Sequence, residues 1–400
     1  MESGVEMEIV IIGGGICGLA TALALHRKGI RSLVLEKSET LRPTGAALIV
    51  LTNGWCALDQ LGVGTTLRRT AIQIERGKLV LLSENDEPKE IPFGVCEEFR
   101  CVRRRDLLEA MADCLPVGTI RFGCQVVSVE IDSKTLNPLL QLSDGSTLHA
   151  KVVIGCDGVN SIVANMVGLK STKRFSTCAT RGLTNYPNGH EFGRDFVMIS
   201  KDKVQVGIIA VNDQLVYWFI TRLWTSRDSK VSRDSTLIRQ SAMESMKGFP
   251  IDAIEMISKC ELNSLHLADL RYRPLWDLVL SNFRKGTMTV AGDAMHATGP
   301  FLAQGGSASI EDAVVLGRCL AQKIMKIDKN VVRVETLVKE AFDNYVKERK
   351  MRILWLSLHT YLIGKKLDTK SFIVNSIIIS IMAILFKDPD VHCRYDCGEL

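Results

Sequence analysis

The residues best suited to chemistry in this chain of 400 residues form a glycine-rich turn near its start. Gly13, Gly15 and Gly18 follow an apolar run with the spacing G-x-G-x-x-G, and a helical pattern begins at Leu19. The first glycine permits a tight turn, the second lets backbone approach a pyrophosphate, and the third lets the helix pack closely on the strand. The phosphates would meet free N–H groups at the positive end of the helix. The pattern predicts a dinucleotide site. Its turn also contains Gly14, Ile16 and Cys17.

An acidic residue follows at the distance that such a site requires. A second apolar run, residues 33–35, ends in Glu36, with Lys37 beside it. An acid at the end of the second strand can accept hydrogen bonds from ribose hydroxyls. Glu36 and Lys37 are therefore assigned to the same site. The pattern leaves open whether the nucleotide is FAD or NAD(P), and a glycine-rich turn in another kind of α/β domain is the structural alternative.

Two later stretches combine an apolar strand with an acidic turn. Residues 152–156 lead into Asp157, and residues 287–291 lead into Gly292 and Asp293. A carboxylate directly after a strand can accept hydrogen bonds from ligand hydroxyls or can cap its own turn. His296 follows closely, and we expect it to hold this loop by hydrogen bonds rather than to act in catalysis.

Composition limits the classes of function. A hydrophobic content of 46% allows a large core, and the net charge of +5 without a basic, aromatic-rich block excludes nucleic acid as an expected partner. The twelve cysteines are scattered, which indicates reduced thiols and a cytoplasmic protein rather than a disulfide framework. Cys393 and Cys397 have no second pair of ligands nearby, so we expect a loose tail and no metal site. A first strand within ten residues of Met1 predicts no targeting peptide.

The end of the chain is strongly apolar. Residues 372–386 contain only three polar side chains, yet fifteen residues are short for a membrane span, which needs about 20. A packed helical hairpin, an interfacial membrane contact, a dimer face and a transmembrane anchor are the alternatives for this segment.

The three turns, together with Pro300 and Gln304-Gly305-Gly306, resemble the single-component, FAD-dependent aromatic hydroxylases. This family includes para-hydroxybenzoate, salicylate and 3-hydroxybenzoate hydroxylases and zeaxanthin epoxidase. The resemblance covers roughly residues 8–349. Within the family the sequence looks most similar to plant monooxygenases near the 3-hydroxybenzoate 6-hydroxylase and salicylate hydroxylase types.

The resemblance implies an α/β fold with a Rossmann-like FAD-binding domain of the GR2 type, built on a parallel sheet. A mixed, mainly antiparallel β substrate domain would be inserted into it, and the C-terminal region would be helical. The expected FAD-binding domain is discontinuous and comprises residues 1–72, 97–169 and 285–345. The substrate domain would comprise residues 73–96 and 170–284, and the helical region residues 346–400.

The resemblance also implies roles for individual residues. Asp293 would accept hydrogen bonds from the ribityl hydroxyls of FAD, and N–H groups at the helix start near Ser307 would stabilise negative charge on reduced flavin. Gln304, Pro300 and Arg181 are the candidates for contact with substrate or the flavin ring, with an ordinary sheet-edge charge as the alternative for Arg181. The other implied cofactor contacts are Gly45, Ala46, Arg104, Asp157, Gly292, Gly305 and Gly306.

Several positions depart from the family pattern. Ala303 stands where a glycine is usual, Ser307 replaces an Asn or Cys, and Ala164 replaces a basic residue. The position that looks comparable to a substrate-deprotonating His or Tyr is Ile208. His190 would be a substitute for that base or an ordinary surface-loop histidine.

The implied reaction starts with hydride transfer from NAD(P)H to FAD and continues with O2 addition to give a C4a-hydroperoxide. The oxygen would then pass to a small aromatic or apolar substrate by hydroxylation or epoxidation. No second G-x-G-x-x-G provides a separate NAD(P)H domain. The alternatives are a flavin oxidoreductase that inserts no oxygen and a flavin-binding regulatory protein with weakened turnover.

Overall fold

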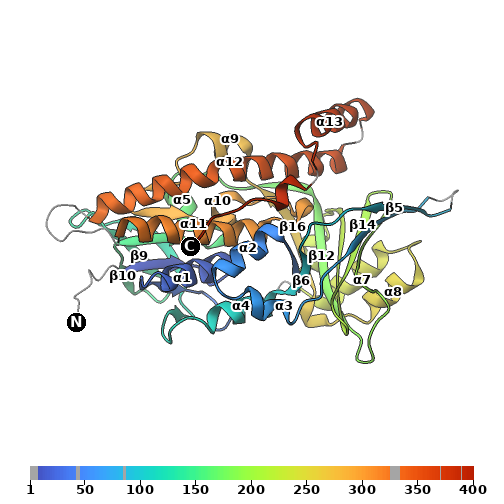
Figure 1. The fold of residues 1–400 in the computed structure, drawn as a ribbon, viewed down its shortest axis with the longest axis horizontal. Coiled ribbons are helices and arrows are strands. Elements are labelled where there is room, and N and C mark those ends of the chain that lie inside the picture. Colours follow the sequence, from blue (N-terminus) through green and yellow to red (C-terminus); the bar gives the residue numbers. More distant parts are fainter. Residues whose placement is uncertain (1–7, 42–45, 84–86, 325–333, 370, 389) are drawn as a thin grey trace.

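The computed structural model describes residues 8–41, 46–83, 87–324, 334–369, 371–388 and 390–400. Gly45, one of the expected cofactor contacts, lies outside these ranges. Figure 1 shows a mixed α/β molecule in which a parallel sheet, a second large sheet and a layer of long helices lie against one another. The α/β fold class expected from the sequence is confirmed.

The first layer is a six-stranded sheet in the order β17-β18-β11-β1-β2-β7. All neighbouring pairs are parallel except β17 and β18. β1 and β11 are buried along their whole length, which explains why their sequences are unbroken apolar runs. The strands are β1 (Ile9–Ile12), β2 (Leu33–Leu35), β7 (Ile120–Arg121), β11 (Val152–Gly155), β17 (Arg284–Lys285) and β18 (Met288–Val290).

Helices surround this sheet. α1 (Ile16–Arg27) packs along α11 (Gly305–Ile324), and α11 in turn packs on α2 (Thr52–Gln60). Nine consecutive residues of α1, from Cys17 to Leu25, are buried, as expected for a helix covered on all sides. The shorter helices of this part are α3 (Gly64–Arg68), α4 (Arg104–Ala112), α5 (Ile162–Met166), α9 (Leu275–Leu280) and α10 (Asp293–His296).

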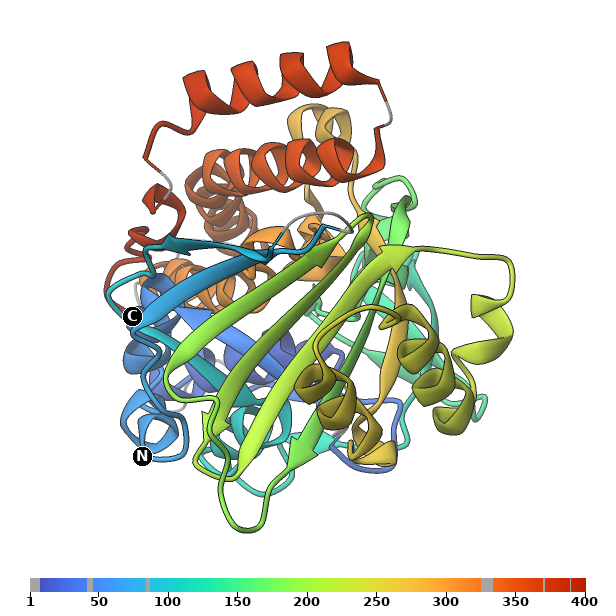
Figure 2. The same cartoon turned by 90° about the vertical axis from the view of Figure 1, so that its right-hand side faces the viewer.

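The second large sheet has seven strands in the order β16-β12-β15-β14-β13-β4-β5. It is antiparallel except where β13 meets β4, in agreement with the mainly antiparallel sheet that was expected. Figure 2 shows α7 and α8 in front of one face of this sheet. The strands are β4 (Arg76–Leu81), β5 (Lys89–Phe93), β12 (Lys173–Asn185), β13 (Asp195–Lys201), β14 (Val204–Asn212), β15 (Leu215–Leu223) and β16 (His266–Tyr272), and the helices on this face are α6 (Asp228–Val231), α7 (Ser235–Ser245) and α8 (Ile251–Ser258).

Two small sheets complete the β-structure. β3 (Ala47–Leu51) and β6 (Phe99–Arg103) form an antiparallel pair that lies between the two large sheets and contributes to the apolar cluster on the second sheet. β8 (Val126–Ile131), β9 (Pro138–Leu142) and β10 (Thr147–His149) form a separate three-stranded sheet.

The C-terminal region is helical, as expected. α12 (Val334–Asp368) packs along α11 and α9, and α13 (Phe372–Leu385) packs on α12 (Figure 1). His359 of α12 stacks on Phe386 with ring centroids 3.9 Å apart, which fastens the end of α13. None of the described helices combines the length and the apolar character that crossing a membrane requires.

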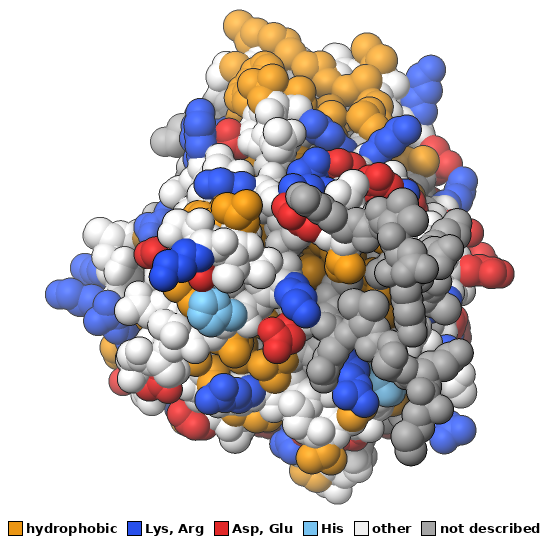
Figure 3. Space-filling model, turned by 90° about the vertical axis from the view of Figure 1, so that its left-hand side faces the viewer, with side chains coloured by type: hydrophobic (Ala, Val, Ile, Leu, Met, Phe, Trp, Pro, Cys, Tyr) orange, Lys and Arg blue, Asp and Glu red, His pale blue; other side chains and the backbone are white. Residues whose placement is uncertain are grey.

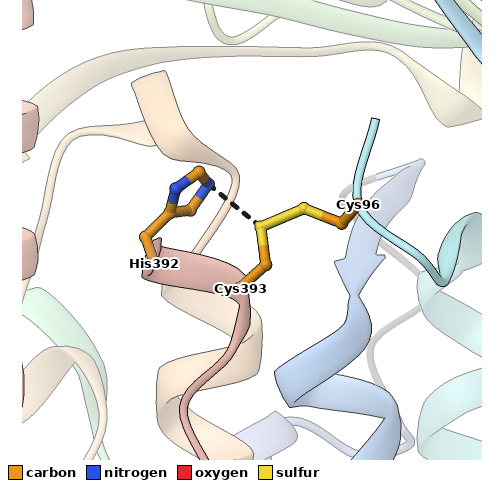
Figure 4. Close-up of side chains that lie close together, drawn as sticks. All are labelled: Cys96, His392 and Cys393. Atoms are coloured by element: carbon orange, nitrogen blue, oxygen red, sulfur yellow. Dashed lines mark hydrogen bonds between the residues drawn. A yellow bond between two sulfur atoms is a disulfide. The ribbon is translucent and has the colours of Figure 1, made fainter. Parts of the chain in front are cut away.

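The expectation of a loose tail with reduced cysteines was wrong for the last residues. Cys393 forms a disulfide with Cys96, 297 residues earlier, and both side chains are buried (Figure 4). His392 Nε2 lies 3.4 Å from Cys393 Sγ, so three potential metal ligands are grouped here, although the two sulfurs are bonded to each other. Arg318 also donates to the carbonyls of Cys397 and Glu399 at 2.6 and 2.8 Å. The tail is therefore fixed to the body of the molecule, because a covalent bond and hydrogen bonds from Arg318 hold it.

We predict that Cys393→Ser lowers the thermal unfolding midpoint when no reductant is present. Closing a long loop with a disulfide stabilises a protein by about 2–4 kcal/mol, mainly by restricting the unfolded chain. Circular dichroism melts with and without dithiothreitol measure this, and reductant should bring the wild type to the level of the variant. Cys56→Ser, which removes an exposed free thiol, is the control and should change nothing. Equal midpoints for wild type and Cys393→Ser without reductant would contradict the prediction.

Candidate active site

The three turns that the sequence places far apart meet at one edge of the parallel sheet. β1, β11 and β18 are adjacent and parallel, so the turns that follow them share the carboxyl edge. Gly13 has φ of +104°, and a Cβ there would lie 2.5 Å from the carbonyl oxygen of Cys156. A Cβ on Gly292 would lie 2.9 Å from Sγ of Cys17. The close approaches require glycine at Gly13 and Gly292, and they join the three turns into one surface.

The start of α1 is open for an anion. Its N-cap is Gly15, no side chain caps the first N–H groups, and no acid lies in the first turn. A Cβ on Gly18 would lie 1.8 Å from the carbonyl oxygen of Gly13, so this glycine allows the helix to meet the turn. The arrangement has the geometry that receives a pyrophosphate in nucleotide-binding folds.

Glu36 braces the same turn. Its Oε2 accepts a hydrogen bond from the Gly14 N–H at 2.7 Å, and its Oε1 accepts one from the Ser38 N–H at 2.9 Å. The Glu36 side chain is buried, whereas neighbouring Lys37 is exposed. Glu36 thus lies beside the glycine turn, as a contact with ribose would require. The contact with ribose itself stays a prediction.

A buried ionic cluster positions the Gly292–His296 turn. Asp312 Oδ2 accepts hydrogen bonds from the Gly292 N–H at 2.8 Å and pairs with His296 Nε2 at 2.6 Å. Arg349 Nε donates to Asp312 Oδ1 at 2.7 Å, and a second nitrogen of Arg349 donates to Glu311 at 2.6 Å. Burial by itself would raise the pKa of Asp312, but the charges of His296 and Arg349 outweigh it and lower the pKa to about 2. His296 therefore holds the loop, as the sequence predicted.

Gln304 is not oriented as the sequence suggested. Its carboxamide forms a reciprocal pair with Asn53, with N···O distances of 2.8 and 3.1 Å, and the side chain is 1% exposed. Asn53 also donates to Glu311, so the pair is an extension of the ionic cluster. The expectation that this amide faces a substrate is corrected: both of its polar atoms are taken up by Asn53.

The loop before α11 has an unusual backbone. Pro300–Leu302 form the 3-10 helix η3, and Ala303 then adopts the left-handed conformation with φ of +54° and ψ of +23°. This conformation is costly for a residue with a Cβ, which explains why a glycine would be the easier choice. Gly305 and Gly306 open α11, and Ser307 is buried with an Oγ that has no hydrogen-bond partner among the described residues.

Basic side chains gather beside Asp293. The Asp293 side chain is accessible to solvent, but the protein surrounds it closely enough to desolvate it. This desolvation raises the pKa of Asp293, whereas the charges of His296, Arg104 and Arg181 act in the opposite direction. Gly15 lies close to Arg104, because a Cβ there would be 4.0 Å from the guanidinium. An accessible but desolvated carboxylate is typical of a group that lines a recess.

Arg181 and His266 extend this basic group onto the second sheet. Arg181 pairs in register with Phe219 of β15 and with His266 of β16. β12 is therefore an interior strand, and the alternative of a sheet-edge charge for Arg181 was wrong. Desolvation and the charges of Arg181 and Arg104 lower the pKa of His266. The sequence analysis missed His266 because no local motif marks it.

The second sheet presents an aromatic face to the loop. Tyr217 of β15 is buried in a cluster with Ile209, Ala46 and Ala303, and its ring lies 6.1 Å from that of Phe219. Burial raises the pKa of Tyr217 to about 12, with a smaller opposing effect from Arg181.

Ile208 lies on the opposite face of this sheet. It belongs to the cluster with Trp218 that packs under α7 and α8. The comparison of Ile208 with a substrate-facing base was therefore wrong, and Tyr217 is a polar residue on the face that meets the loop.

Other expected residues lie at different places. Asp157 Oδ2 accepts a hydrogen bond from the Ile162 N–H at 2.7 Å, while its buried Oδ1 has no partner within the described part of the chain. His190 Nε2 lies 2.7 Å from the carbonyl oxygen of Asn212, in a loop beside a cavity of about 350 Å³ that also involves Arg194. The structure thus gives His190 the surroundings of a loop histidine.

The comparisons with known proteins agree with this geometry. The family model described as FAD binding domain matches residues 6–349. Monooxygenase 1 of Arabidopsis thaliana is 46% identical over 398 residues, covering 99% of this chain and all of that protein. Monooxygenase 2 of the same plant is 38% identical, with 91% and 90% of the two chains covered. The structure of Klebsiella pneumoniae HpxO complexed with FAD and uric acid has a TM-score of 0.76 at 21% identity and covers 97% of this chain and 96% of that one, which shows a shared fold.

We predict that Asp312→Asn destabilises the protein at neutral pH and changes how the free energy of unfolding depends on pH under acid conditions. Because the pKa of Asp312 lies near 2 instead of the ordinary 3.8, its charge contributes stability above pH 3.8 that is lost as pH falls towards 2. The difference corresponds to a stabilisation on the order of 2 kcal/mol. Urea unfolding at pH 7 should show a loss of at least this size, and the gap from wild type should narrow near pH 2.

Asp343→Asn is the matched control. Asp343 pairs with Arg284 on the surface, where such pairs contribute less than about 1 kcal/mol. Equal effects of the two substitutions would contradict the importance assigned to Asp312.

Proposed function

The chain belongs to the family of single-component FAD-dependent aromatic hydroxylases, and from that premise we propose an NAD(P)H-dependent monooxygenase. It would insert one oxygen atom of O2 into a small aromatic or apolar substrate by hydroxylation or epoxidation. The observation that supports this proposal most strongly is the meeting of the turns after β1, β11 and β18, which creates a single surface for one extended nucleotide.

The residues at this surface fit FAD. The uncapped start of α1 suits the pyrophosphate, Glu36 is beside it for the ribose, and Asp293 is an accessible acceptor for ribityl hydroxyls. The start of α11, with Gly305 and Gly306 and no acid in its first turn, would place partial positive charge near the pyrimidine edge of the ring. FAD would supply hydride acceptance and oxygen activation, while these residues bind and orient it.

The substrate would lie between the loop of Pro300 and the aromatic face of the second sheet. Tyr217, Phe219 and Phe196 form a row there, with successive ring centroids 6.1 and 6.4 Å apart. Such rings favour a planar, apolar substrate. With a pKa of about 12, Tyr217 stays protonated at neutral pH, so it would donate a hydrogen bond to a substrate oxygen rather than remove a proton.

Basic residues support the proposed use of NAD(P)H. Arg104 and Arg181 lie around Asp293, and together they give the site a positive potential suited to a second, transiently bound phosphate-rich molecule. The same charges would also act on the phosphates of FAD, so they support nucleotide binding at this edge without distinguishing NADH from NADPH.

We predict that the purified protein contains FAD and oxidises NAD(P)H faster with its substrate than without it. In ¹⁸O2, one labelled oxygen atom should enter the product, which mass spectrometry of an incubation with phenolic and apolar plant metabolites detects. The Asp293→Ala variant should bind FAD at least about tenfold more weakly than the wild type. The reason is that a hydrogen bond to a charged group contributes about 1.5–3 kcal/mol. Asp113→Ala, which changes an exposed acid directly after α4, is the control. Turnover without oxygen and without label in the product would establish the oxidoreductase alternative.

A further prediction concerns Tyr217. Tyr217→Phe should lower kcat/KM about 5-fold for a substrate with an oxygen substituent, because one neutral hydrogen bond contributes about 1 kcal/mol. Because the phenol stays protonated, the pH profiles of wild type and variant should have the same shape between pH 6 and 10. If kcat/KM of the wild type changes with pH in this range and Tyr217→Phe abolishes that change, Tyr217 acts as a base instead.

A further inference from the structure

The outermost helix of the molecule is apolar and uncovered. α13 (Phe372–Leu385) contains no charged residue, and Phe372, Ile373 and Ile384 are 83%, 70% and 67% exposed. Ile378 is the buried large aliphatic side chain of this helix. Soluble monomers rarely expose an apolar patch of this kind, so we expect this surface to bind another molecule.

The apolar exposure continues around the helix. Ile377 and Ile379 are two positions apart and so project from nearly opposite sides, yet they are 53% and 46% exposed. Figures 1 and 2 both show α13 raised above α12 on the outside of the molecule. A protein partner packs against one side of a helix, whereas lipid surrounds several sides at once. The distribution of exposed side chains therefore fits lipid better than a second copy of this chain.

The charges around α13 suit an anionic lipid surface. Residues 365–387 contain four lysines and one aspartate. Lys366 before the helix and Lys387 after it are exposed. Asp368 accepts a hydrogen bond from Ser176, and nearby Asp388 is paired with Arg394 at 2.7 Å. Lysines that flank an apolar segment can reach lipid phosphates while the segment enters the acyl boundary.

A second apolar element lies on the same side. α9 also packs on α12, and its Trp276 and Leu280 are 75% and 80% exposed. Figure 3 shows hydrophobic side chains gathered along the top of the molecule, the level of α9 and α13 in Figure 1, with basic side chains bordering them. Tryptophan is favoured at the boundary between water and lipid.

We propose that α13 docks the protein on the surface of an anionic lipid bilayer, with α9 as a second contact. The helix is about 21 Å long, shorter than the roughly 30 Å hydrocarbon core, so it lies in the interface and does not cross. Docking places the proposed catalytic site close to the lipid, because α12 connects the two: a Cβ on Gly364 would lie 2.8 Å from the ring of Phe301, in the loop before α11.

Vesicle sedimentation of the full-length protein tests the proposal. The wild type should bind vesicles of phosphatidylcholine with phosphatidylserine more strongly than phosphatidylcholine alone, and added salt should reduce the difference. Ile373→Glu with Ile384→Glu should reduce binding about tenfold or more, since both side chains would leave the acyl region. Val117→Glu with Leu136→Glu, which alters two exposed aliphatic residues elsewhere, should bind as wild type does.

A charge-reversal pair keeps the test independent of the apolar substitutions. Lys366→Glu with Lys387→Glu leaves the apolar face intact and should weaken binding to anionic vesicles by about fivefold or more for each lysine. Melting curves and analytical ultracentrifugation of every variant check folding and association. Failure of the wild type to sediment with either vesicle would overturn the proposal. So would a dimer that Ile373→Glu with Ile384→Glu dissociates. Neither readout depends on turnover, so docking and the proposed reaction are tested separately.

Discussion

The buried pairing of Asp312 and Glu311 with Arg349 is the interaction on which the rest of the site depends. All three side chains have no exposed surface, and two adjacent carboxylates on α11 can be buried only because a guanidinium from α12 lies between them. Asp312 then fixes the Gly292 turn, and Glu311 fixes Asn53 of α2 and, through it, Gln304. One charge cluster therefore connects the parallel sheet, the loop before α11 and two helices. Removing any member would leave a buried charge with fewer partners, which is why these positions are energetically linked.

The C-terminal tail completes this cluster rather than merely following it. The Tyr395 ring lies 4.9 Å from the guanidinium carbon of Arg349 and 4.8 Å from that of Arg352. Arg352 donates to the carbonyl of His392, beside the cysteine that is bonded to Cys96. Tyr395 thus covers Arg349 from solvent, and exclusion of water strengthens the electrostatic interactions underneath.

The sequence was sufficient for features that depend on local patterns. The turn at Gly13 and the acid at Glu36 both follow from short stretches whose spacing predicts a nucleotide site. Features that depend on register or distant pairing could not be predicted. A shift of one residue moves a side chain to the other face of a sheet, and this separates Ile208 from its neighbour Ile209, which lies opposite Tyr217. The Cys96–Cys393 bond and the contact of Arg349 with Asp312 likewise join segments with no shared pattern.

The two alanines with positive φ near the proposed flavin site show how such a site tolerates strain. Ala303 and Ala46 have φ of +54° and +44°, and a left-handed residue with a Cβ costs about 1–2 kcal/mol. Each is held by its surroundings: the Ala303 N–H donates to the carbonyl of Pro300 at 2.9 Å, and the Ala46 carbonyl accepts from the Arg104 N–H at 3.1 Å. Both alanines pack on the Tyr217 face of the second sheet. The strained loops therefore lie against the Tyr217 face, and the packing beside the proposed substrate region is also what keeps these backbones in place.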